Sequence, residues 1–148
     1  MNKSRVRIII YIQKDILYLG EFLMSDDSKT ILIVDDDELL RDFYTRILKS
    51  KGYNVICAEN GDDAITILDG DHDVSLVIAD LLMPVRTGWE LIEYMKNTES
   101  LKDIHVIAIT GLATSIEEFE RVKSTCAAVL QKGNFELGEF TAIIEDIL

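Results

Sequence analysis

Residues 31–38 read Ile31-Leu32-Ile33-Val34-Asp35-Asp36-Asp37-Glu38. The four apolar residues form a continuous run, which is typical of a strand that is buried on both faces of a parallel sheet. The acidic residues that follow are favourable at the N-terminal end of a helix, where the helix dipole is positive. This stretch therefore predicts a buried strand that leads directly into a helix.

The same alternation of an apolar run and an amphipathic helical pattern continues along the chain. Further strands are expected over Tyr53–Ala58, Val74–Ala79, Ile104–Ile109 and Ala127–Leu130. A helix is expected after each strand, with apolar residues at helical spacing facing the core. These stripes include Leu40, Phe43, Tyr44, Ile47 and Leu48 in the first helix, Ile116, Phe119 and Val122 in the fourth, and Leu137, Phe140 and Ile144 in the last.

Five such βα units predict an α/β fold with a five-stranded parallel sheet and helices on both faces, joined by right-handed crossovers. The expected arrangement is the flavodoxin-like doubly wound (βα)5 fold with strand order 2-1-3-4-5. A chain of 148 residues suits one domain of this kind.

The composition argues against several partners and compartments. Asp and Glu outnumber Lys and Arg by 27 to 15, for a formal charge of -12, and this field repels nucleic acid. Cys57 and Cys126 lie in apolar surroundings and have no metal-ligand spacing, so both are expected to be small buried residues in a reducing compartment. A cytoplasmic protein that binds neither nucleic acid nor membranes is expected.

The first 28 residues differ from the rest and are expected to be an N-terminal extension to a domain spanning residues 29–148. The apolar run Ile8–Ile12 ends after five residues. A signal-peptide core needs roughly 7–15 apolar residues and a membrane-spanning helix about 20. We therefore expect Met24 to be the functional start, with residues 1–23 an appendage. The alternative is a short amphipathic helix that carries Ile12, Ile16, Leu19 and Leu23.

Polar residues follow four of the five predicted strands. Asp35 and Asp36 follow the first strand, Asp80 the third, Thr110 the fourth and Lys132 the fifth. The carboxyl ends of parallel strands share one edge of the sheet, and ligands bind there. In the order 2-1-3-4-5 the first and third strands are neighbours, so the three carboxylates crowd together.

Such crowding needs a counter-charge. Two unit charges about 4 Å apart repel by about 4 kcal/mol at an effective dielectric of 20. Mg²⁺ prefers oxygen ligands from carboxylates, waters and phosphates, and it would align a phosphoryl group for attack by a carboxylate. Lys132 can pair with phosphoryl oxygens as a point charge and the Thr110 hydroxyl can donate to another. The set suits phosphoryl transfer to an aspartate.

Four motifs now resemble one known family, the receiver (CheY-like) domain of two-component response regulators. They are Val34-Asp35-Asp36, Asp80-Leu81-Leu82-Met83-Pro84 with Gly88, Ile109-Thr110-Gly111, and Lys132. The spacing D-x-x-M-P-x-x-x-G is the most distinctive of them. The resemblance covers about residues 29–148.

The resemblance implies a single-domain response regulator whose Asp80 accepts a phosphoryl group from a sensor histidine kinase or a histidine phosphotransfer protein. By the same resemblance, Asp35, Asp36, Asp80 and the backbone carbonyl of Leu82 hold Mg²⁺, and Thr110 and Lys132 bind the phosphoryl oxygens. The output is then binding to a separate downstream protein, or phosphate relay. No enzymatic activity is expected beyond self-catalysed phosphorylation and dephosphorylation.

The chain departs from the family at several positions. Gly133 stands where the family has a cis proline after its lysine, so Lys132 is expected to be held less firmly. Val129 stands where an aromatic side chain commonly accompanies the movement of the threonine. Leu82 and Leu112 offer no group to orient a hydrolytic water, which predicts a long-lived phosphoaspartate.

Two alternative functions are compatible with parts of the pattern. The Asp-x-Asp within residues 35–37 is reminiscent of haloacid-dehalogenase phosphatases, in which the first Asp, here Asp35, is the nucleophile. That alternative leaves the Met-Pro-x-x-x-Gly segment unexplained. The second alternative is a receiver-like scaffold that does not turn over phosphate, because of Gly133 and Val129.

Overall fold

A computed structural model describes residues 3–12, 15–25, 28–111 and 115–148, with backbone only before residue 28. Its main unit is a five-stranded parallel sheet of β3 (Thr30–Val34), β4 (Asn54–Ala58), β5 (Val74–Asp80), β6 (His105–Thr110) and β7 (Ala128–Gln131). The strands lie in the order β4-β3-β5-β6-β7. Counted from β3, this is the order 2-1-3-4-5, which confirms the predicted fold.

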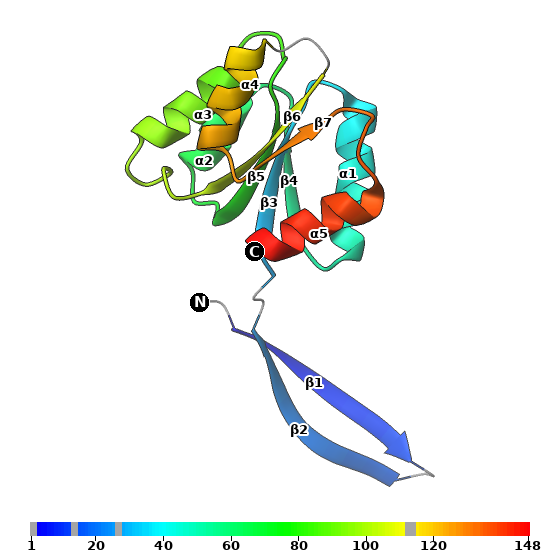
Figure 1. The fold of residues 1–148 in the computed structure, drawn as a ribbon. Helices are drawn as coiled ribbons and strands as arrows, with labels where there is room; N and C mark the ends of the chain where they lie inside the picture. The colour runs from blue at the N-terminus through cyan, green and yellow to red at the C-terminus, as the bar shows by residue number, and fades with distance from the viewer. Residues whose placement is uncertain (1–2, 13–14, 26–27, 112–114) are drawn as a thin grey trace.

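Helices cover both faces of this sheet (Figure 1). On one face lie α1 (Glu38–Ser50) and α5 (Leu137–Ile147), and on the other α2 (Gly61–Leu68), α3 (Gly88–Asn97) and α4 (Ile116–Thr125). Side chains fix where four of these helices begin, because Asp37, Asn60, Thr87 and Ser115 accept hydrogen bonds from backbone N–H groups of the first turn. Ser115 and Glu118 form a capping box at the start of α4.

The core has two layers, one on each face of the sheet. Under α1 and α5, the rings of Tyr44, Phe135 and Phe140 pack together, with centroids of Tyr44 and Phe140 5.3 Å apart. Under α2, α3 and α4 the buried side chains are mostly aliphatic and include Ala64, Leu68, Leu91, Ile92, Met95 and Val122. The strand residues between them are almost completely buried, as the continuous apolar runs predicted.

Some side chains lie differently from the prediction. Phe43 is 50% exposed and Ile116 84% exposed, so the apolar stripes of α1 and α4 are narrower than expected. Cys57 was expected to be buried, and this is wrong. It lies exposed on β4, an edge strand, where only one side of the ribbon has a neighbour. Cys126 is half-buried, and burial raises the pKa of its thiol to about 11.

The segment before the sheet forms two strands, β1 (Lys3–Ile12) and β2 (Asp15–Ser25), which pair antiparallel. The amphipathic helix considered for this region is therefore wrong, since residues 15–25 pair as a strand with residues 3–12. Within the described ranges, no helix has both the length and the apolar character needed to cross a membrane.

The core packing generates a test of the fold. Phe140 is fully buried, so Phe140→Ala removes a ring from the aromatic cluster and leaves a cavity. We expect the free energy of unfolding to fall by about 3–5 kcal/mol in urea titrations followed by circular dichroism. Phe119→Ala, at a side chain that is 40% exposed, is the matched control and should lower it by less than about 1 kcal/mol. Equal losses for the two variants would contradict this packing.

Candidate functional site

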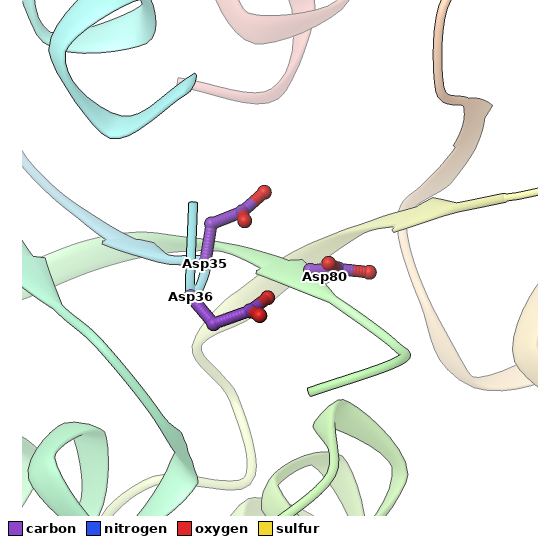
Figure 2. A group of neighbouring side chains, drawn as sticks. All are labelled: Asp35, Asp36 and Asp80. Atoms are coloured by element: carbon purple, nitrogen blue, oxygen red, sulfur yellow. The ribbon is translucent and has the colours of Figure 1, made fainter. Parts of the chain in front are cut away.

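Three carboxylates meet at the carboxyl edge of the sheet (Figure 2). Asp35 follows β3 and Asp80 ends the neighbouring strand β5, while Asp36 lies beside Asp35. One oxygen from each of the three lies within 4.8 Å of the others. Asp35 and Asp80 are almost completely buried, at 2% and 4% exposure, and Asp36 is exposed. The structure thus brings together the three acids that the sequence placed at this edge.

Lys132 lies against this cluster and balances part of its charge. Its Nζ donates to Asp80 Oδ2 at 2.6 Å and lies 3.2 Å from Asp35 Oδ2. Its backbone N–H donates to the carbonyl of Thr110 at 2.7 Å, which ties the end of β7 to the end of β6. A single ammonium group therefore faces both of the buried carboxylates.

The turn that carries Lys132 is fixed by Gly133 rather than by a proline. The N–H of Asn134 donates to the carbonyl of Gln131 at 3.1 Å, which closes a four-residue turn. Gly133 has φ of +76°, a conformation that favours glycine over other residues. With glycine at this position the Lys132 side chain still contacts two aspartates, while how firmly it is held stays a prediction.

The charges of the site shift the pKa values of its members. Burial raises the pKa of Asp35, and this outweighs the stabilising hydrogen bond from the Asp37 N–H and the charge of Lys132. For Lys132, burial acts to lower the pKa, but the hydrogen bond and charge of Asp80, together with Asp35, raise it above its usual value. The site thus stabilises the charged form of Lys132 and destabilises the ionised form of Asp35.

One oxygen of the site lacks a hydrogen-bond donor. Asp35 Oδ1 accepts from the Asp37 N–H at 2.9 Å. Asp35 Oδ2 is buried, and its partner among the described residues is an ion pair with Lys132 Nζ at 3.2 Å that lacks hydrogen-bond geometry. A buried carboxylate oxygen without a donor is destabilising, and a hard cation that takes oxygen ligands removes that penalty. The donor set of three carboxylates therefore fits a divalent cation such as Mg²⁺.

The segment after β5 holds Asp80 in place. The N–H of Leu82 donates to Asp80 Oδ1 at 3.1 Å. Gly88, at the start of α3, packs directly on the backbone of Asp80, and a Cβ at this position would lie 2.2 Å from the Asp80 carbonyl oxygen. The glycine of the D-x-x-M-P-x-x-x-G pattern is therefore required by this close approach. In the segment between Asp80 and Gly88, Val85 adopts φ of +69°, which is unfavourable for a β-branched residue.

Thr110 lies at the same edge but is not directed at the carboxylates by a hydrogen bond. It ends β6 and is 3% exposed, and its hydroxyl donates to the carbonyl of Gly111 at 3.0 Å. A contact with a phosphoryl oxygen would require this hydroxyl to leave Gly111. Leu112, two residues further, lies outside the described residues.

The sequence analysis missed one residue of the site, Arg41 in the second turn of α1. Its guanidinium donates to the backbone carbonyl of Asp35 at 2.7 Å, and its side chain is 12% exposed. Side chains on a helix lean toward the helix N-terminus, so an arginine one turn into α1 reaches back to the end of β3. The direction in which helix side chains lean was the only feature of the sequence that could have indicated Arg41, and no motif distinguished this arginine from the others.

Comparison with known proteins adds the family to this geometry. Residues 31–145 match the family model of the response regulator receiver domain. The chain is 30% identical over 105 residues to the polar-differentiation response regulator DivK of Brucella abortus, covering 71% of this chain and 85% of DivK. It is 33% identical over 130 residues to histidine kinase P4 of Formosa agariphila, covering 88% of this chain but 9% of that kinase.

Solved structures agree with the fold. The response regulator TrrA from Thermotoga maritima, solved in complex with Mg²⁺-BeF, matches with a TM-score of 0.68 at 28% identity. The match covers 81% of this chain and 99% of the TrrA chain. The family match over most of the chain, the relatives and the shared topology show that this chain belongs to the response regulator receiver domain family, whose members are the phosphoacceptors of two-component signalling.

Proposed function

We propose that Asp80 is the residue that accepts the phosphoryl group, with Mg²⁺ held by Asp35, Asp36, Asp80 and the backbone carbonyl of Leu82. One observation carries the proposal. Asp80 belongs to the acidic cluster and accepts the hydrogen bond from Lys132 Nζ at 2.6 Å, whereas that ammonium group lies 3.2 Å from Asp35 Oδ2. A phosphoryl group on its oxygen would have a cation on each side. The TrrA structure with Mg²⁺-BeF gives this arrangement a precedent in the family.

Each residue has a defined task in the proposed transfer. The Leu82 N–H holds Asp80 Oδ1 and Lys132 Nζ holds Asp80 Oδ2, and the Asp80 carboxylate is the proposed nucleophile. An oxygen of Asp80 forms the new P–O bond while the P–N bond of a donor phosphohistidine breaks, and the electron pair returns to the imidazole. Bound Mg²⁺ would withdraw charge from the transferring group.

Lys132 and Thr110 respond to the new charge. The phosphoryl group adds roughly -1.5 to -2 charge at the end of β5. Lys132 Nζ, 2.6 Å from Asp80 Oδ2, would exchange the carboxylate for a phosphoryl oxygen, and the Thr110 hydroxyl would leave the Gly111 carbonyl for another. Because Thr110 ends β6 and α4 is the next helix along the chain, the proposed output is a change in the surface formed by α4.

The proposal extends to partners and location. The donor is a sensor histidine kinase or a histidine phosphotransfer protein, and the output is binding to a separate downstream protein or phosphate relay. The proposed functional unit spans residues 29–148, after an N-terminal extension of 1–28. Because such donors present phosphohistidine in the cytoplasm, the proposal places the chain there.

The two alternative functions fit the geometry less well. A phosphatase that uses Asp35 as its nucleophile leaves unexplained the hydrogen bond from Lys132 to Asp80 and the close approach of Gly88 to the Asp80 backbone. The scaffold alternative was based partly on Gly133, but the Lys132–Asp80 ion pair forms with glycine at that position. A scaffold without phosphoryl chemistry does not require this ion pair. Both alternatives are outcomes of the first experiment below.

Incubation with Mg²⁺ and acetyl phosphate should place an alkali-labile acyl phosphate on Asp80, located by mass spectrometry. Asp80→Asn is nearly isosteric, so it should abolish the label while circular dichroism stays unchanged. A label on Asp35 would support the phosphatase alternative. Absence of a label, together with absence of beryllofluoride binding, would support the scaffold.

The cluster should destabilise the protein when no cation is bound. Because burial raises the pKa of Asp35 in the folded state, its ionised form opposes folding above that pKa. In EDTA at pH 7, Asp35→Asn should therefore raise the free energy of unfolding, measured in urea. The gain should shrink as the pH falls through the raised folded-state pKa, and it should vanish below the unfolded-state value of 3.8, where the carboxylate is protonated in both states.

Mg²⁺ provides the control for this experiment. Millimolar Mg²⁺ should stabilise the wild-type chain and leave Asp35→Asn almost unchanged, because the variant lacks one ligand. Equal stabilisation of both proteins would rule out Asp35 as a ligand.

The phosphoaspartate should be long-lived. The Leu82 side chain is 51% exposed beside Asp80 and has no group to orient an attacking water. Leu82→Asn should speed hydrolysis about tenfold, which corresponds to about 1.4 kcal/mol of transition-state stabilisation. The decay of ³²P-labelled protein measures this, with Leu39→Asn on an exposed position of α1 as the control. Wild-type decay as fast as in chemotaxis-type receivers would refute it.

A further inference from the structure

Arg41 is the one strongly basic side chain that contacts the acidic edge, within the described residues, without bonding to a carboxylate of the cluster. Its Nη1 donates to the backbone carbonyl of Asp35 at 2.7 Å. Its Nη2 lies 3.4 Å from Glu59 Oε1, on the residue that follows β4. The side chain is 12% exposed, whereas that of Glu59 is 73% exposed. Arg41 is therefore a largely buried guanidinium that spans the ends of two neighbouring strands.

The contact fixes the main chain at the point where the first metal ligands leave the sheet. The N–H of Asp35 donates to the carbonyl of Ala58 at 3.2 Å, so β4 holds the Asp35 backbone on its amide side. Arg41 holds it on its carbonyl side. The Asp35 N–H belongs to the peptide that joins Val34 to Asp35, whereas the bond from Arg41 acts on the peptide that joins Asp35 to Asp36 and helps to set the plane of that peptide. The direction in which the exposed Asp36 carboxylate leaves the backbone depends on that plane.

The choice of acceptor also matters. A cation that bonded to a carboxylate of the cluster would compete with Mg²⁺ for its oxygens. Arg41 bonds instead to a neutral carbonyl, so it orients the ligands and leaves their oxygens free. Lys132 differs in this respect, because it pairs directly with Asp80 and Asp35. The two cations therefore have separate tasks at one site.

From this geometry we infer that Arg41 is a positioning residue for the metal ligands, acting through the Asp35 carbonyl to direct Asp35 and Asp36 toward the cation. The inference rests on the proposed function, since it requires that Mg²⁺ binds at this cluster. Outer contacts that orient metal ligands typically contribute 10–100-fold to metal affinity. An effect of this size is expected here for the loss of the Arg41–Asp35 bond.

Positioning and simple electrostatics predict opposite signs, which makes the inference testable. Arg41→Gln removes a positive charge close to a divalent cation, so electrostatics alone would tighten Mg²⁺ binding. Loss of positioning weakens it. We expect the Kd for Mg²⁺, from isothermal calorimetry of the full chain titrated with MgCl₂, to rise about tenfold in Arg41→Gln. Arg41→Lys retains a donor but not the planar fork, and its Kd should lie between those of wild type and Arg41→Gln.

Two controls isolate the Asp35 contact. Glu59→Gln breaks the exposed ion pair but retains the bond to Asp35, so its Kd should stay within about twofold of wild type. In an Asp36→Asn background, where one of the two ligands that Arg41 orients is already lost, adding Arg41→Gln should raise the Kd by a smaller factor than it does in the wild type. An equal effect of Glu59→Gln, or full additivity with Asp36→Asn, would overturn the inference.

Stability measurements separate positioning from a purely structural role. Each variant is unfolded in urea with EDTA present, and the titrations are made at a temperature at which circular dichroism shows every variant folded. If Arg41 only anchors α1, Arg41→Gln lowers the free energy of unfolding and leaves the Kd of the folded protein unchanged or lower, which overturns the inference. If the wild type itself binds no Mg²⁺, the proposed function fails. If the wild type and Arg41→Gln bind Mg²⁺ with equal Kd values, the proposed function stands and only the inference about Arg41 fails.

Discussion

The constraint on which the site depends is an excess of negative charge at one edge of the sheet. Two carboxylates, Asp35 and Asp80, are almost completely buried there, and a third lies beside them. One ammonium group, that of Lys132, faces the buried pair, and one oxygen of Asp35 still lacks a hydrogen-bond donor. A fold that holds such an arrangement gives up stability that a bound cation would restore.

The rest of the edge is built to keep this arrangement in place. Gly88 lets α3 begin against the backbone of Asp80, and Gly133 closes the turn that presents Lys132. Arg41, from α1, donates a hydrogen bond to the backbone carbonyl of Asp35. Each contact comes from a different element, and each acts on the backbone or the charge of an aspartate. The site is therefore a property of the whole sheet edge and not of any one loop.

The departures from the family pattern have local physical explanations. In place of a proline after the lysine, this chain uses a glycine with positive φ, and the lysine still reaches both aspartates. Val129 is half-buried in β7 and packs against the aliphatic core layer, which a strand position of this kind allows. The same position cannot offer a ring that rotates. Movement at Thr110 would therefore have to be transmitted by the backbone of β6 and the segment that follows it.

The sequence by itself determined the fold and the membership of the acidic cluster. Apolar runs that alternate with amphipathic helical patterns predicted a parallel sheet in the order 2-1-3-4-5, which places Asp35, Asp36 and Asp80 at one edge, and the structure brings one oxygen of each within 4.8 Å of the others. Periodicity could not determine how much of Phe43, Ile116 or Cys57 is covered, because burial depends on which neighbouring element lies over each position. Nor could it identify Arg41 or the hydrogen bond of Thr110, since these depend on side-chain directions that only the packed helices and strands decide.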